Sequence, residues 1–141
     1  MAISTAFTIE NTVVTVNDRH ISDWGNSDPA YSEEPIDPKR NFPRGLGGNA
    51  TVLERTNPGR RVTLNLRPGS DDSAFLHNLY LKGTTITLSR NQISALDGCI
   101  GTEGIITQEQ GLTRVGFSQI SDDTFVIEFN TWASTRGGEV A

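Results

Sequence analysis

The sequence predicts a mainly β fold, a β-sandwich or barrel with one flanking α-helix at about residues 70–82 and a long early loop. Apolar and polar residues alternate in several short runs, which is the period of strands with one buried face. A single run has apolar residues at helical spacing. Glycine and proline separate the runs, and counting them gives roughly seven to nine strands. At 141 residues the chain is long enough for one domain with its own core, covering residues 1–141.

The chain begins with a predicted β-hairpin. Residues 7–9 open a strand, and the β-branched run at 12–16 continues it. Asn17 and Asp18 suit a two-residue turn, so a return strand is expected from Arg19 to near Gly25.

The early loop is predicted at residues 25–48. Four of the six prolines fall here, and prolines at this density exclude both a helix and a central strand. A long insertion of this kind is uncommon in a small domain and is usually functional or disordered. Tyr31, Ile36, Phe42 and Leu46 give it apolar side chains that gain from burial. We therefore favour a segment that becomes ordered on assembly over the alternative of a floppy surface loop.

The middle of the chain has the best-defined pattern. Residues 50–55 predict a strand, and the alternation at 62–66 predicts the next one. Ser70 is a good N-cap for the helix, and Gly83 suits the left-handed position after its last turn. Alternation resumes at 84–88, so this part of the chain predicts a strand, a helix and a strand.

Three further strands are expected in the last third of the chain. Residues 99–107 are punctuated by glycines and predict a bulged strand. Residues 112–119 alternate in polarity and predict the second strand, and residues 125–130 predict the third. Residues 133–141 are expected to form a frayed tail.

The charges are unevenly distributed along the sequence. The formal net charge is −5, which argues weakly against stable nucleic-acid binding. Residues 39–67 hold seven of the 12 basic residues and one of the 17 acidic ones, a net charge of +6, so the rest of the chain carries −11. A monomer can mix these charges on its surface, whereas a self-assembling subunit can use them as complementary patches. Charge alone leaves both interpretations open.

Features of membrane insertion and secretion are missing from the sequence. No run is long enough to span a membrane, and the first residues lack the basic and apolar segments of a signal peptide. Cys99 is the single cysteine, which excludes an internal disulfide framework. We therefore expect cytoplasmic synthesis and no membrane partner.

Residues that carry chemistry are present, but they do not form a catalytic or metal-binding pattern. Cys99 has no activating base nearby in the sequence, and the histidines are not grouped with other ligands. Trp24 and Trp132 are interpreted as core or interface anchors rather than as ligand platforms. We expect no enzymatic activity, no cofactor and no metal. The residues considered for such roles are His20, His77, Cys99, Asp71, Asp72, Asp122 and Asp123.

Three blocks of the sequence resemble the tail tube proteins of contractile-tailed phages. The blocks are the opening hairpin with its return at residues 13–25, the segments 50–55 and 59–66 with the helix at 70–82, and the late strand at 125–129. Together they cover most of the chain. The sequence departs from the family pattern at Asp23, where a glycine is more typical, and in its unusually proline-rich early loop.

This resemblance implies a structural subunit that forms hexameric rings, which stack into a tube for DNA delivery. The early loop at 25–48 would contact a neighbouring ring, and the basic segment would meet acidic surface on adjacent subunits. The implied contact residues are Pro29, Tyr31, Pro35, Ile36, Arg40, Phe42, Arg44, Arg60 and Arg61.

The same resemblance implies partners and a location. The partners are further copies of the chain and the tail sheath, tape measure, baseplate and tail terminator proteins. DNA would pass through the tube without specific binding. The location is the virion tail, after assembly in the host cytoplasm.

A second class of function stays open at this stage. A β-sandwich on a virion surface could bind glycans or a receptor, with Trp24, Trp132 and the early loop as the ligand site. The sequence does not indicate which sheet face would line a tube, or whether the particle is a phage tail or another injection device.

Overall fold

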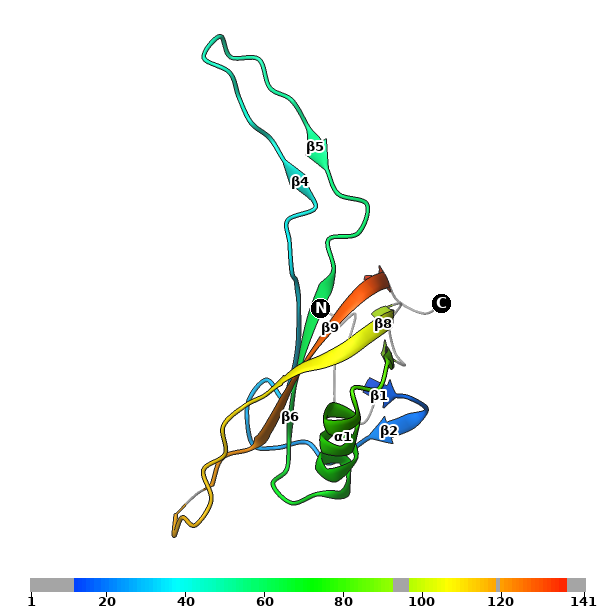
Figure 1. The fold of residues 1–141 in the computed structure, drawn as a ribbon, viewed down its shortest axis with the longest axis vertical. Helices are drawn as coiled ribbons and strands as arrows, with labels where there is room; N and C mark the ends of the chain where they lie inside the picture. Colours follow the sequence, from blue (N-terminus) through cyan, green and yellow to red (C-terminus); the bar gives the residue numbers. More distant parts are fainter. Residues whose placement is uncertain (1–11, 93–96, 119, 137–141) are drawn as a thin grey trace, which may run out of the picture.

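The computed structural model describes residues 12–92, 97–118 and 120–136. Within these residues it confirms a mainly β fold with one helix (Figure 1). The elements are β1 (Thr12–Val16), β2 (Arg19–Ile21), β3 (Tyr31–Pro35), β4 (Arg40–Asn41), β5 (Leu53–Glu54), β6 (Arg60–Leu66), α1 (Asp71–Lys82), β7 (Ile86–Gln92), β8 (Asp97–Glu109) and β9 (Asp123–Thr135).

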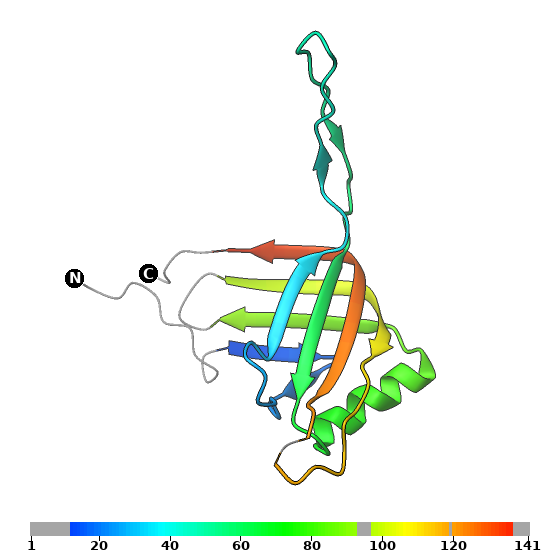
Figure 2. The same cartoon turned by 90° about the vertical axis from the view of Figure 1, so that its left-hand side faces the viewer.

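Seven strands form one antiparallel sheet in the order β2-β1-β7-β8-β9-β6-β3, and β4 and β5 form a separate ribbon. The long strand β9 bends, so that it runs beside β6 with its first half and beside β8 along most of its length (Figure 2). This bend curls the sheet into a half-barrel. The core therefore lies inside one curled sheet rather than between two separate ones.

The core consists of side chains from the inner face of the sheet together with Leu76 of α1. The buried apolar residues are Val14, Val16, Ile21, Val62, Leu64, Leu66, Leu76, Ile86, Leu88, Cys99, Ile106, Phe125, Ile127 and Phe129. Trp24 and Trp132 are partly buried against this core, which confirms their interpretation as anchors.

Glycines in β8 make room for aromatic rings of the core. A Cβ atom on Gly104 would lie 2.4 Å from Cδ1 of Phe129, and one on Gly101 would lie 2.6 Å from Cε3 of Trp132. The pairing of β8 also shifts register opposite both of its neighbours. The predicted bulged strand is therefore confirmed, and close packing explains two of its glycines.

The helix and the opening hairpin form as predicted. The side chain of Ser70 accepts a hydrogen bond from the backbone N–H of Ser73, and Gly83 adopts a left-handed conformation with φ 65°. Asn17 and Asp18 both have positive φ, as a two-residue hairpin turn requires. The predicted strand at 7–9 lies outside the described residues. No helix in the described part of the chain has the length and apolar character to cross a membrane.

Part of the predicted early loop is a strand. Residues 31–35 form β3, which pairs with β6 at one edge of the sheet, so the expectation of a structureless segment from 25 to 48 is wrong there. An edge strand tolerates Pro35 because one side of its backbone needs no partner. The prolines exclude a central strand, but they are compatible with the edge strand β3.

Three further boundaries differ from the prediction. The strand expected at 50–55 is only the short β5, which leaves the core to pair with β4. Residues 112–118 form no strand and lie in the loop between β8 and β9. Residues 133–135 belong to β9 instead of a tail, because β8 continues beside them.

Candidate assembly surfaces

A long two-stranded ribbon projects from the sheet, and we call its residues 38–57 the arm (Figures 1 and 2). Every residue of the arm is exposed. Backbone hydrogen bonds hold its two sides together, including 2.8 Å from the N–H of Arg55 to the C=O of Lys39 and 2.8 Å from the N–H of Gly45 to the C=O of Asn49. The arm is thus an ordered hairpin that contacts little of its own subunit.

The arm carries four large apolar side chains in exposed positions: Phe42, Leu46, Val52 and Leu53. Burial of each is worth about 1.5–3 kcal/mol when it is complete. The subunit covers Leu46 not at all and the other three only in part. These side chains therefore provide a driving force for contact with another surface.

The structure divides the predicted contact residues between the arm and its base. Arg40, Phe42 and Arg44 lie in the arm. Ile36, Arg60 and Arg61 lie where the arm leaves and re-enters the sheet, and Cδ1 of Ile36 lies against Gly59. The remaining three belong to β3 or to the segment before it: Pro29, Tyr31 and Pro35.

Most basic residues of the segment 39–67 have a carboxylate partner within the same subunit. The ion pairs are Arg40–Glu54 at 3.0 Å, Arg55–Asp37 at 3.0 Å, Arg60–Glu33 at 3.7 Å, Arg61–Glu128 at 3.0 Å and Arg67–Asp23 at 3.5 Å. The uneven charge distribution of the sequence is therefore largely balanced by folding. Lys39 and Arg44 have no ion pair among the described residues.

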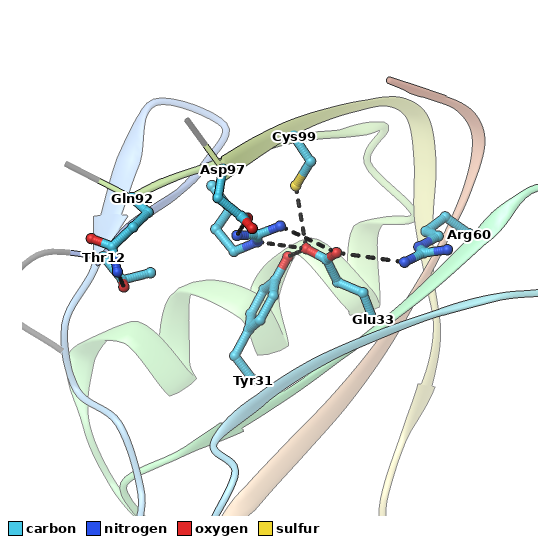
Figure 3. Close-up of polar contacts among 8 residues, drawn as sticks. Thr12, Tyr31, Glu33, Arg60, Gln92, Asp97 and Cys99 are labelled. Atoms are coloured by element: carbon cyan, nitrogen blue, oxygen red, sulfur yellow. Dashed lines mark hydrogen bonds and ion pairs between the residues drawn. The ribbon is translucent and has the colours of Figure 1, made fainter. Parts of the chain in front are cut away.

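A buried polar network lies beneath the base of the arm (Figure 3). Its centre is the Glu33 carboxylate on β3, whose side chain is only 10% exposed. This carboxylate accepts hydrogen bonds from Nε of Arg90 at 2.7 Å and from the thiol of Cys99 at 3.2 Å, and from the Tyr31 hydroxyl. Arg90 also donates to Asp97 at 2.8 Å. The network joins β3, β7 and β8 across the inside of the curl.

The contacts within the network shift the pKa values of Glu33 and Cys99 in opposite directions. Burial alone would raise the pKa of Glu33, but hydrogen bonds from Arg90 and Tyr31 outweigh it and hold the pKa below its usual value. Burial, with the adjacent Glu33 charge, raises the pKa of Cys99 to about 11. Cys99 is therefore a buried thiol and not an activated nucleophile, as the sequence predicts.

The arrangement anchors both ends of the arm. β3 leads into the arm and β6 receives the chain from it, and the network ties Glu33 of the first strand to Arg60 of the second. The position of the arm is thus set by a rigid sheet. Sequence reasoning did not identify Glu33, Arg90 or Asp97, because residues of three separate strands show no common spacing.

A second exposed apolar surface lies at the opposite end of the molecule, in the loop between β8 and β9 (Figures 1 and 2). We call its described residues, 110–118 and 120–122, the distal loop. Leu112, Val115 and Phe117 are exposed there, the last two completely. The N–H of Ser121 donates to the C=O of Thr113 at 3.0 Å and closes the loop. The residues whose alternating polarity predicts a strand instead form a loop with exposed apolar side chains.

A third surface is the outer face of β1, β7, β8 and the end of β9. Strand register places one side chain from each strand in a row across this face, at Thr15, Ser89, Ile100 and Ala133. Val13, Asn91, Thr102, Thr131 and Thr135 belong to the same face by the same register. None of these side chains is charged, and Glu103 lies at the border of the face, bonded to Asn130 at 2.9 Å.

Two aspartates join distant segments in addition to the roles expected from sequence. Asp72, in the first turn of α1, is buried and accepts hydrogen bonds from the N–H groups of Ser22 and Asp23 and from Arg19. Asp122 accepts from the N–H and hydroxyl of Ser27 at 2.8 and 2.6 Å. Each of these two aspartates therefore stabilises the fold by holding together segments that are distant in the sequence.

The other residues considered for chemistry are not assembled into a site. His77 is exposed, with Nδ1 at 3.0 Å from Glu109, and His20 is exposed on β2. The described residues contain no group of three histidine, cysteine or acidic side chains that could hold a metal. Because Trp24 and Trp132 pack against the core, they do not form an exposed platform for a glycan.

Comparison with known proteins identifies the fold. No family model matches the chain, and no curated protein matches its sequence. The structure is similar to the anti-feeding prophage cap, a tube terminating cap, with 13% identity and a TM-score of 0.61 over 96% of this chain and 94% of the other. The tail-tube fold that the sequence resemblance implies is therefore confirmed.

Two further structures share this fold. One is a chain of the sheath-tube complex of the extracellular contractile injection system PVC, with 13% identity and a TM-score of 0.55 over 92% of this chain and 91% of the other. The other is Hcp1 from Flavobacterium johnsoniae, with 16% identity and a TM-score of 0.53 over 92% and 97%.

Proposed function

We propose that this chain is a structural subunit that assembles into stacked hexameric rings, which form the inner tube of a contractile phage tail or related particle. The observation that carries the proposal is the arm, an ordered hairpin whose residues are all exposed, with four apolar side chains and a base held by the sheet. The fold shared with chains of tube and cap assemblies supports it. The role is structural and involves no catalysis and no cofactor.

In this proposal the arm contacts the adjacent ring. Phe42 supplies apolar contact area, and Arg40 and Arg44 meet acidic surface on the neighbouring subunit. The residues at the base of the arm, among them Ile36, Arg60 and Arg61, hold it in the direction that stacking requires. The subunit remains a single domain from 1 to 141, with the arm as its inter-subunit element.

The uncharged outer face of β1, β7, β8 and the end of β9 lines the channel. DNA binding depends on Lys and Arg neutralising phosphates with release of counterions. A wall without basic side chains cannot bind DNA in this way, so DNA passes without specific contacts. The other partners are the sheath, tape measure, baseplate and terminator proteins, and the tube is part of a virion or particle tail assembled in the host cytoplasm.

Removal of the arm tests this proposal. Residues 38–57 are replaced by an Asn-Gly turn, which preserves β3, Glu33 and the backbone bond of 3.1 Å from the N–H of Asp37 to the C=O of Pro58. The shortened subunit should fold with unchanged circular dichroism but should not form long tubes in electron micrographs. Leu81→Glu, at an exposed position of α1 outside the arm, is the control and should still form long tubes. Long tubes made by the shortened subunit would overturn the proposal.

A further inference from the structure

We propose that the distal loop is the docking surface for the tip of the arm of a second copy of this chain. The inference rests on the proposed function, in which the arm reaches the next ring, and it names the surface that receives it. The tip comprises residues 44–50, with Leu46 fully exposed at its end.

The geometry of the subunit favours this contact. The arm and the distal loop lie at opposite ends of the longest axis of the molecule (Figure 1). A second copy displaced along that axis therefore presents its distal loop to the tip of the first. Such a contact joins two different surfaces and does not close on itself, so repetition produces a filament or tube rather than a dimer.

Both surfaces carry apolar side chains that their own subunit leaves uncovered. On the arm these exposed side chains are Leu46 and Phe42. On the distal loop they are Leu112, Val115 and Phe117. A hollow of about 270 Å³ beside the loop is lined by residues of α1, β8 and the loop, including His77, Glu109 and Leu112. It is close in size to the smallest ligand pockets, about 300 Å³, and has room for one apolar side chain.

Arg44 at the tip of the arm and Glu109 beside the distal loop have opposite charges. Residues 38–57 contain four basic residues and one acidic residue, a net charge of +3. The distal loop, residues 110–122, contains Arg114 and Asp122 and has no net charge, and Glu109 at its border adds one negative charge. Arg44 lies at the tip with no ion pair among the described residues, so a carboxylate such as Glu109 is a suitable partner for it.

The conformation of the distal loop also favours a role in binding. Val115 has φ 61°, a left-handed conformation that β-branched residues rarely adopt. This conformation directs an apolar side chain into solvent at a local cost, and such strain is found most often at functional positions.

Cross-linking between copies tests the contact directly. Leu46→Cys and Phe117→Cys are made singly and together, and the assembled protein is treated with a short bis-maleimide. The native Cys99 is buried and serves as its own unreactive control. The double variant should give a ladder of linked copies on a denaturing gel. A mixture of the two single variants should give dimers only, and each single variant alone should give neither product.

A charge substitution provides a second test of the contact. Phe117→Glu places a charge at a fully exposed position, so folding is unaffected, and should raise the concentration needed for tubes by about tenfold or more. Leu81→Glu makes the same kind of change at an exposed position of α1 outside the proposed contact. It should leave the concentration needed for tubes unchanged.

The outcomes separate this inference from the proposed function. If the unsubstituted protein forms no assemblies, the proposed function fails and the inference with it. If tubes form but neither the ladder nor the Phe117→Glu effect appears, the arm docks elsewhere or on a different protein. The inference is then wrong, while the proposed tube role stands.

Discussion

Nε of Arg90 on β7 donates a hydrogen bond of 2.7 Å to the Glu33 carboxylate on β3, although β8, β9 and β6 lie between these two strands in the sheet. The contact is possible because the sheet curls until its third and seventh strands face each other. Arg90 is 14% exposed and Glu33 is 10% exposed, so the pair is largely desolvated. This pair closes the half-barrel directly below the arm.

Removal of the Glu33 carboxylate should destabilise the subunit. In Glu33→Ala, Arg90 and Arg60 lose a shared partner inside the curl, and uncompensated buried charge is costly. We expect a loss of about 2–4 kcal/mol in the free energy of unfolding, measured by urea denaturation of the unassembled subunit. The neighbouring Glu34→Ala removes a carboxylate that is 63% exposed and should change stability by less than about 1 kcal/mol. Equal effects of the two substitutions would contradict the role assigned to the network.

Stability should decrease in acid. Burial tends to raise the pKa of Asp72, but the N–H groups of Ser22 and Asp23 and the Arg19 guanidinium outweigh it, and its pKa is lowered like that of Glu33. The unfolded chain, with carboxyl pKa values of about 4, then binds protons before the folded one. The stabilisation is present above that pH and is lost as the pH falls through the folded-state pKa.

Urea midpoints recorded between neutral pH and about pH 3 measure this dependence. The variant Asp72→Asn should have a lower midpoint at neutral pH and a smaller further decrease in acid. An acid-induced decrease as large as in the unsubstituted protein would show that Asp72 does not contribute to it.

Gly104→Ala should destabilise the fold by overpacking. The added methyl group would lie 2.4 Å from the ring of Phe129 and 3.2 Å from the C=O of Ile86, and neither group can move freely in the core. We expect a loss of about 1–3 kcal/mol, visible as a lower melting temperature. Gly47→Ala in the arm is the matched control, because no atom beyond its two chain neighbours lies within 4 Å of its Cβ position. A melting temperature unchanged in Gly104→Ala would mean that the core has more room than the structure indicates.

Local signals account for the elements that the sequence predicts correctly. The hairpin turn at Asn17 and Asp18, the helix between Ser70 and Gly83, and strand β6 are each specified by residues a few positions apart. Their capping, turn chemistry and periodicity do not depend on the rest of the fold.

The errors arise where a local pattern has a non-local explanation. Alternation at 112–118 is typical of a strand, but these residues find no partner strand, and their apolar side chains remain exposed. The sequence pattern does not predict β3, because pairing with β6 stabilises this strand despite Pro35. The network around Glu33 depends on the curl of the whole sheet, which no short segment encodes.

Assembly of the purified chain tests the central claim most directly. Negative-stain electron microscopy over a range of protein and salt concentrations should show rings of uniform diameter that stack into tubes with a central channel. Monodisperse monomers under every condition, confirmed by sedimentation, would contradict the account.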